Sequence, residues 1–359
     1  MWPSPTRPAK EDAESLDGIE KLIQILFMWA DAAGGFEMKE LDKKSTDTAR
    51  AAWLYYIEEF TQSQIADKLG VSRSTVIRLL QRAKESGLVT ISLGVSQETF
   101  KLERDLERRF GLNTVRIVPE AEDGETQRRW LGQVAAGTLQ EMARQNSILA
   151  ISWGRTMRAM ADSLQGEASV SGMKAVALIG GLHNADRGTN PYEVAKLVGQ
   201  FFNAPDRALY APVYVRNAET AAGLMSDPGL SEALDMARRA SLVIFSVGSL
   251  SEKATMLQLG FVNPTEKEFL IRQGAVGDIA CRWINSMGKP VELPPTIHPI
   301  GIALADLRNI PQRLLVAGGA SKTLAILASL RGGYATHLIT DEGVAAALLT
   351  ENQILDYSS

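Results

Sequence analysis

The chain has 359 residues, a formal net charge of −4 and 45% hydrophobic residues. Its length suggests about two domains, and its composition is typical of a soluble globular protein without a membrane-spanning segment. The negative charge balance argues against a protein that coats nucleic acid over its whole surface, so any DNA contact requires a local basic patch. The single cysteine, Cys281, excludes an intrachain disulfide and a zinc site built from cysteines.

The absence of a secretory signal and of metal-ligand spacing further limits the class of protein. The start of the chain, MWPSPTRPAKEDAES, lacks the apolar core of a secretory signal, so we expect a cytoplasmic protein with no membrane partner. The histidines His183, His298 and His337 do not have metal-ligand spacing, and we expect no metal and no other cofactor.

Residues 1–95 are predicted to be mostly helical. Residues 1–45 form an extension in which Leu16–Ala33 carries a helical stripe of apolar residues. We place a DNA-binding domain at residues 46–95, with a leading helix over Thr46–Phe60 and a short strand, the wing of a winged domain, over Leu88–Leu93. The candidate core residues of the leading helix are Ala52, Leu54, Tyr55, Ile57 and Phe60.

Between these elements, Thr61–Leu80 has the pattern of two short helices that meet at a tight turn. Thr61 and Gln64 fit a capping box at the start of the first helix. Gly70 follows where a left-handed residue costs least, and Ser72 can cap the second helix. This order of residues indicates a DNA-binding helix-turn-helix.

The second of these helices has an outer face suited to the major groove. Val76, Leu79 and Leu80 are predicted to face inward, and the segment from Arg73 to Lys84 has four basic residues and no acid. A helical hairpin with a solvated basic face is the alternative. The predicted contacts to double-stranded operator DNA are Ser72, Arg73, Ser74, Thr75, Arg78 and Arg82.

The rest of the chain is predicted to form an α/β domain. Glu98–Phe110 is a charged helix, which we interpret as a connector within residues 96–112. From Thr114 onward, buried strands alternate with amphipathic helices, a pattern typical of a mostly parallel, Rossmann-like sheet at residues 113–359. The predicted strands are TVRIV, ILAIS, KAVALIG, LVIFSVG, RLLVAGG and THLIT.

Five segments of small and polar residues are candidates for strand ends, four of them after strands named above and one at Gly277-Asp278-Ile279. In open α/β sheets ligands bind outside the carboxyl ends of the strands. Lys322 in a first helical turn indicates an anionic ligand, because a helix N-terminus disfavours a cation. For each segment an ordinary turn, or a lysine directed to solvent, remains the alternative. The candidate ligand contacts are Ser152, Gly154, Arg155, Thr156, Gly180, Gly181, Gly248, Asp278 and Lys322.

These motifs together resemble the SorC family of sugar-responsive bacterial transcriptional regulators, over Thr48–Leu349. The resemblance rests on the ordered run TQSQIADKLGVSRSTVIRLL, ISWGRTM, ALIGGL, FSVGS, GDIACRW, PIGIALADLRNIP, VAGGASK, LRGG and LITDE. It implies a large domain similar in fold to sugar-phosphate isomerases and glucosamine-phosphate deaminases, without their catalysis. It also implies a homotetramer whose operator affinity depends on a small carbohydrate effector.

The resemblance assigns the SWGRT loop, Ser152–Thr156, to the phosphate or terminal hydroxyls of the effector, and Asp278 and Lys322 to its other oxygens. This loop holds Trp153 and Arg155 where relatives often have a Gly/Thr-rich run, which leaves a free sugar or polyol open beside a sugar phosphate.

Three functions fit these patterns. The leading hypothesis is a regulator, such as a repressor, of a carbohydrate-utilisation operon. The second is a sugar-phosphate isomerase or deaminase with an accessory DNA-binding domain, although no nucleophile–base–acid set is visible in the sequence. The third is a constitutive architectural DNA-binding protein. We predict the regulator, which is not an enzyme.

Overall fold

The structure is a computed structural model that describes residues 43–58, 60–86, 88–89, 97–166, 168, 170, 172–181 and 189–350. The predicted helix at Leu16–Ala33 and most of the predicted wing strand lie outside the described residues. The chain divides into two compact units, Met1–Ile91 and Ser92–Ser359. Among the described residues, no helix combines the length and the apolar character needed to cross a membrane.

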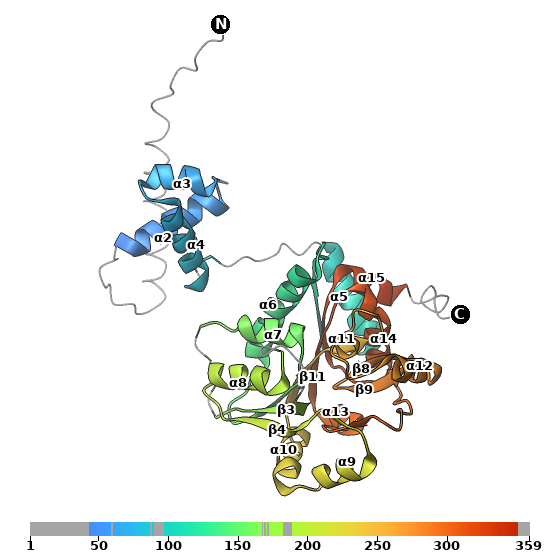
Figure 1. The fold of residues 1–359 in the computed structure, drawn as a ribbon. Coiled ribbons are helices and arrows are strands. Elements are labelled where there is room, and N and C mark those ends of the chain that lie inside the picture. Colours follow the sequence, from blue (N-terminus) through green and yellow to red (C-terminus); the bar gives the residue numbers. More distant parts are fainter. Residues whose placement is uncertain are drawn as a thin grey trace. The chain divides into compact units, whose positions relative to one another are not determined.

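The described residues of the first unit form three helices, which Figure 1 shows as a small bundle: α2 (Lys43–Tyr56), α3 (Gln62–Leu69) and α4 (Arg73–Glu85). The predicted capping box is confirmed, because Thr61 Oγ1 accepts from the Gln64 amide at 3.4 Å and Gln64 Oε1 accepts from the Thr61 amide at 2.9 Å. Gly70 ends α3 in the left-handed conformation with φ 63°, and Ser72 caps α4. The helix-turn-helix geometry predicted from the sequence is therefore present.

The core of this unit confirms part of the prediction and corrects another part. Val76, Leu79 and Leu80 of α4 are buried, together with Ile65, Ala66 and Ala51. Tyr55 and Ile57, predicted as core, are instead exposed, at 37% and 62% of their surface. The buried stripe of α2 runs through Thr48, Ala51 and Ala52, an i, i+3, i+4 pattern of small side chains that lets α2 approach α4 closely.

The second unit is built on a seven-stranded sheet in the order β1-β12-β11-β6-β2-β3-β4, with every neighbouring pair parallel. Six strands coincide with the segments predicted from the sequence. The seventh, β4, was missed because its residues DRALYAP lie on an edge and are largely exposed, so they lack a continuous apolar run. The strands are β1 (Thr114–Val118), β2 (Ile148–Ile151), β3 (Lys174–Gly181), β4 (Asp206–Pro212), β6 (Leu242–Phe245), β11 (Gln312–Val316) and β12 (His337–Asp341).

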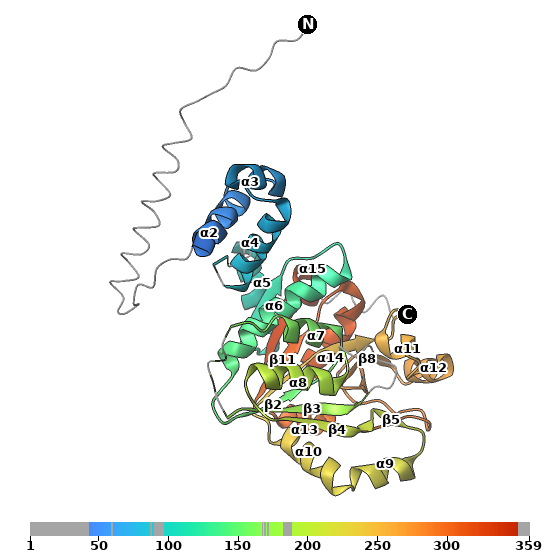
Figure 2. The same ribbon diagram turned by 60° about the vertical axis from the view of Figure 1, so that its left-hand side comes forward.

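Helices cover both faces of this sheet (Figure 2). The helices α6 (Gly124–Met142), α7 (Arg155–Asp162) and α8 (Pro191–Phe201) pack side by side on one face. The chain then reverses its direction across the sheet, and right-handed crossovers place the later helices on the other face. These are α10 (Pro228–Arg238), α13 (Leu304–Asn309), α14 (Thr323–Arg331) and α15 (Glu342–Leu349).

Among the described residues, two small sheets, three short α-helices and a 3-10 turn (Ala320–Lys322) complete the unit. The antiparallel sheet β7-β8-β9 contains β7 (Val247–Ser249), β8 (Ala275–Ile279) and β9 (Arg282–Asn285), and β5 (Tyr214–Val215) pairs with β10 (His298–Pro299). Because β7 follows β6 after a single residue, the chain passes directly from the parallel sheet into the small one. The short helices are α9 (Ala218–Met225), α11 (Thr255–Gln258) and α12 (Pro264–Arg272).

The predicted connector helix, α5 (Gln97–Phe110), packs on α15 and on the edge strand β1. Glu103 Oε1 accepts a hydrogen bond from the Ile117 amide at 3.0 Å, and Glu107 Oε1 accepts one from the Val115 amide at 2.9 Å. These carboxylates satisfy amides that an edge strand would otherwise leave open. In this structure α5 is thus an integral part of the second unit.

The close packing of α6 on α7 depends on Gly132. A Cβ atom at Gly132 would lie 2.6 Å from the carbonyl carbon of Ala159, whereas a Cβ at Gly137, on the same helix, meets nothing within 4 Å. A side chain at residue 132 would therefore push the two helices apart.

These two glycines form a matched pair for substitution. We expect Gly132→Ala to lower the free energy of unfolding by about 1–3 kcal/mol through overpacking. We expect Gly137→Ala to raise it by about 0.5–1 kcal/mol, because alanine favours a helix interior. Urea denaturation of both variants checks this, and equal effects would contradict the packing described.

Candidate functional site

A cavity of about 640 Å³ opens at the carboxyl ends of β1, β2, β6 and β11. The chain leaves β2 for a helix on one face of the sheet and leaves β6 for the other face, so the cavity lies at the topological switch point. Its walls come from the segments 120–128, 153–156, 246–258 and 318–322, with Leu131 and Asp278. Four separate parts of the second unit therefore meet around one space.

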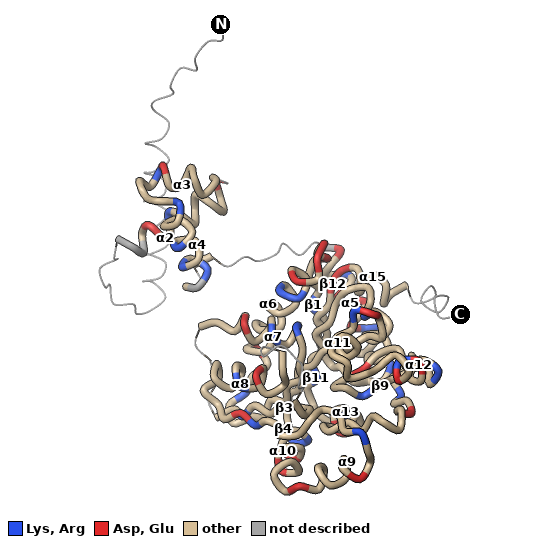
Figure 3. Tube along the Cα trace, viewed as in Figure 1, with Lys and Arg blue, Asp and Glu red and all other residues tan. Residues whose placement is uncertain are grey.

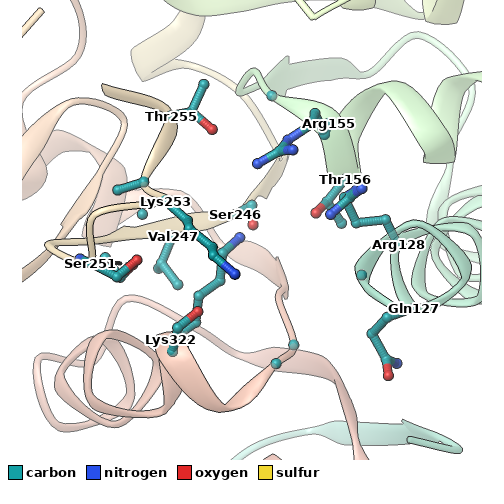
Figure 4. A pocket seen from close by; sticks show the side chains of 18 of the residues that line it. Gln127, Arg128, Arg155, Thr156, Ser246, Val247, Ser251, Lys253, Thr255 and Lys322 are labelled. Atoms are coloured by element: carbon teal, nitrogen blue, oxygen red, sulfur yellow. Dashed lines mark hydrogen bonds between the residues drawn. The ribbon is translucent and has the colours of Figure 1, made fainter. Parts of the chain in front are cut away.

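Four basic side chains line this cavity: Arg128, Arg155, Lys253 and Lys322. Figure 4 shows that Arg128 and Arg155 extend into it from α6 and α7, and Lys322 from the start of α14. Within the described part of the chain, none of the four side chains forms an ion pair or a hydrogen bond. Four cations without an ion-pair partner around one space favour an anionic ligand, although Asp278 offsets part of the charge of Lys322.

The helices that begin at the cavity add to this positive field. The N-cap of α7 is Gly154, which has no side chain to cap the helix, and the Lys322 side chain at the N-cap of α14 makes no capping hydrogen bond. The first amides of α7 are thus left for another acceptor, whereas the Thr323 amide that opens α14 already donates to the Ala320 carbonyl. Open amides and a nearby cation at helix N-termini are the features of a phosphate or carboxylate site.

Burial and neighbouring positive charges lower the pKa values of two of these cations, Lys322 and Arg128. Burial and the neighbouring Arg155 and Arg128 lower the pKa of Lys322 to about 8, although Asp278 acts in the opposite direction. Burial, followed by the charge of Arg155, lowers the pKa of Arg128. An anion placed among these groups would relieve their mutual repulsion.

Asp278 is the buried carboxylate of the cavity, only 3% exposed. It was predicted at the rim of the main sheet, but it lies in β8 of the small antiparallel sheet, directly opposite Gly248 of β7. A Cβ on Gly248 would lie 2.0 Å from Asp278 Oδ1, so glycine leaves the room that the carboxylate occupies. Asp278 Oδ2 accepts the Cys281 amide at 3.0 Å.

A second buried carboxylate holds one of the loops that line the cavity. Asp341, at the end of β12, accepts the Gly319 amide at 2.6 Å and the Val344 amide at 2.9 Å. A Cβ on Gly318 would lie 2.3 Å from Asp341 Oδ2. Gly318 of VAGGASK is therefore explained by close approach of this carboxylate, and Gly319 by its positive φ of 92°. The carboxylate fixes the loop that carries Lys322.

The structure brings six of the nine predicted ligand contacts together. Gly154, Arg155, Thr156, Gly248, Asp278 and Lys322 all line the cavity. Ser152, Gly180 and Gly181 are absent from the described lining. At Gly180 the close approach is made by the neighbouring strand, since a Cβ there would lie 2.4 Å from the carbonyl oxygen of Ala211.

Three further polar residues line the cavity outside the predicted contacts, although one of them, Ser246, lies in the FSVGS motif. Arg128 lies one turn inside α6, and Lys253 lies in the loop after β7. Ser246 Oγ is buried and has no partner in the described structure, so it is free for a polar ligand. A cation near the start of a predicted helix was the available signal for Arg128; nothing in the local sequence marks Lys253. No cluster of metal-ligating side chains occurs among the described residues.

The predicted DNA-binding residues lie together on α4. Arg73, Ser74, Arg78 and Arg82 are exposed, and Figure 3 shows basic residues along this helix. Ser72 and Thr75 are engaged locally: Ser72 Oγ accepts the Thr75 amide at 3.2 Å, and Thr75 Oγ1 accepts from Arg78 at 3.3 Å. We interpret these two as groups that cap the helix and orient Arg78.

Asp278 gives the site a testable pH dependence. Burial raises its pKa from an ordinary 3.8 to about 6, so the folded chain holds this proton more tightly than the unfolded chain. Its stabilising contribution is complete below the unfolded value and is lost as the pH rises through about 6. As the pH rises from below 3.8 to above about 6, we expect the free energy of unfolding of the wild type to fall by roughly 1–3 kcal/mol relative to that of Asp278→Asn. Urea denaturation at successive pH values measures it, and a constant difference would refute the buried, ionisable state.

Comparisons with known proteins now identify the family. A family model described as "Putative sugar-binding domain" matches residues 96–350, and one described as "Homeodomain-like domain" matches residues 44–90. The Deoxyribonucleoside regulator of Bacillus subtilis is 33% identical over 311 residues, which are 86% of this chain and 99% of that protein. The transcriptional regulator LsrR of Escherichia coli (strain K12 / DH10B) is 33% identical over 306 residues, 84% of this chain and 93% of that protein.

The fold agrees with this relationship. The full-length sorbitol operon regulator SorC from Klebsiella pneumoniae matches with a TM-score of 0.66 and 26% identity, over 86% of this chain and all of that one. These relatives are named as regulators, not as isomerases or deaminases. The chain therefore belongs to the SorC family of sugar-binding transcriptional regulators, and it is a regulator with a DNA-binding helix-turn-helix rather than an enzyme.

Proposed function

We propose that this regulator controls a carbohydrate-utilisation operon and that its effector is a phosphorylated sugar bound in the cavity of the second unit. The convergence of Arg128, Arg155, Lys253 and Lys322, unpaired among the described residues, carries this proposal. A phosphate supplies the negative charge that these groups lack. A free sugar or polyol, the alternative left open by the sequence, would leave their repulsion unrelieved.

The other lining groups suit the sugar part of such an effector. Asp278 can accept from a sugar hydroxyl, and Ser246 Oγ offers a buried donor and acceptor. Thr156 and Ser251 add two more hydroxyls to the wall. The relatives named for deoxyribonucleosides and sorbitol support a carbohydrate effector, while the identity of the sugar is left to the binding experiment.

The proposal includes three finer features expected of this family. The protein acts as a cytoplasmic repressor, it assembles as a homotetramer, and it requires no cofactor other than its effector. Support for these features comes from the family relationship alone. Effector binding changes operator affinity only if the two states of the protein bind the effector with different affinities.

Effector binding can be tested with sugars and their phosphates in a thermal-shift screen. We expect one phosphorylated sugar to raise the melting temperature, because at 100 times its Kd it stabilises the folded state by about 2.7 kcal/mol. The corresponding free sugar should not raise it. Arg155→Ala and Lys322→Ala should each weaken that binding by at least about tenfold, as expected for lost charge-assisted hydrogen bonds. The same variants should still bind operator but respond poorly to the effector.

Arg158→Ala is the matched control, because Arg158 lies on the same helix as Arg155 but pairs with Asp162 at 2.7 Å, outside the cavity. It should respond as the wild type does. Stabilisation by a free sugar, unchanged in the Arg155 and Lys322 variants, would overturn the phosphate assignment.

Operator binding depends on the exposed basic face of α4. We expect Arg73→Ala and Arg78→Ala to weaken binding to an operator fragment, by on the order of 1–3 kcal/mol where the arginine contacts a base. A phosphate contact would instead weaken binding evenly across sequences and reduce its salt dependence. Fluorescence anisotropy at several salt concentrations distinguishes the two, and wild-type affinity in both variants would show that α4 is not the recognition helix.

A further inference from the structure

We propose that Ile77 reads the 5-methyl group of a thymine in the major groove, and so sets part of the operator sequence. This inference rests on the DNA-binding part of the proposed function. Ile77 lies in the middle of α4 and is 44% exposed, whereas its apolar neighbours Val76, Leu79 and Leu80 are buried in the core of the unit. The helix therefore presents one large apolar side chain at its exposed surface, beside the core face.

The helical period places Ile77 among the DNA-contacting residues. It lies three and four residues after Ser74 and Arg73, which are therefore its neighbours on the surface of α4, and Arg78 follows it about 100° further around the helix. All four are exposed. Contact of this face with a major groove would bring Ile77 to the base edges, because the N-terminal half of a recognition helix contacts the bases.

The groups around Ile77 are held in place by neighbours within the unit. Arg73 Nε donates to Gln62 Oε1 at 3.3 Å, and Arg78 Nη2 donates to Thr75 Oγ1 at 3.3 Å. These contacts engage the two guanidinium groups within the unit. The apolar side chain is thus placed on a surface whose positive charge complements DNA and whose other members are polar.

The chemistry of Ile77 selects one base. Its side chain has no hydrogen-bonding group, so it cannot match the donors and acceptors of guanine, cytosine or adenine in the major groove. Thymine alone adds an apolar group there, its C5-methyl. Burial of a methyl group against the isoleucine favours thymine at one position of each half-site, next to positions read by the arginines.

The test starts from operator sequences that the wild-type full chain selects out of a random duplex library. We expect a thymine preference that Ile77→Ala loses and Ile77→Val largely keeps, while the other positions of the motif stay unchanged. In a selected duplex, deoxyuridine then replaces that thymine and removes only its methyl group. Wild-type affinity should fall about three- to fivefold for each half-site changed, and Ile77→Ala should bind both duplexes equally.

Ile57→Ala is the matched control, since Ile57 is 62% exposed but lies beyond α2, outside the recognition helix. It should keep the wild-type motif and the wild-type response to deoxyuridine. Equal deoxyuridine sensitivity in Ile77→Ala and wild type would overturn the inference, as would a lowered melting temperature of Ile77→Ala with an unchanged motif. Failure of the wild type to select any sequence would instead refute operator binding itself.

Discussion

The second unit is organised around the mutual repulsion of like charges in its cavity. Arg128, Arg155 and Lys322 come from three different elements; burial and then the charge of Arg155 lower the pKa of Arg128, and burial with the charges of Arg155 and Arg128 lowers that of Lys322. Such an arrangement costs free energy in the unliganded protein, because like charges in a partly buried space are weakly screened. The arrangement is maintained because α6 packs on α7, and α14 packs on the small sheet and on α15. This packing fixes the backbone positions from which the three side chains extend.

The parallel sheet explains why these charges meet. Parallel strands have their carboxyl ends at one edge, so the loops that follow β1, β2, β6 and β11 collect there. Glycines then allow two carboxylates to approach: Gly248 faces Asp278, and Gly318 faces Asp341. One of these carboxylates partly offsets the charge of Lys322, and the other fixes the loop that bears it. The site is therefore a consequence of backbone close approach as much as of its charged side chains.

Features encoded by neighbouring residues could be predicted from the sequence. The capping box at Thr61, the left-handed Gly70 and the cap at Ser72 each depend on a few adjacent residues, and all three are present. Arg155 and Lys322 were likewise visible as cations at the starts of helices. The fold class followed from the alternation of buried strands and amphipathic helices.

Features that depend on tertiary packing could not be read in this way. Nothing in the local sequence distinguishes Lys253 from an ordinary loop lysine. It lines the cavity because the loop after β7 lies there. The pair Gly180-Gly181 looks like a ligand-binding turn, yet the backbone of β4 occupies the space that Gly180 leaves. Tyr55 and Ile57 fit a helical stripe, but the phase of α2 is decided by the small residues Ala51 and Ala52 that face α4.

The position of the cations also bears on how an effector changes the protein. Arg155 begins α7 and Lys322 precedes α14, and these helices lie on opposite faces of the sheet. An anion bound by both would attract the two layers toward a common centre, so its affinity depends on how the layers are packed. A ligand shifts a conformational equilibrium only by its difference in affinity for the two states. In the function proposed above, a phosphate held between the layers would supply such a difference.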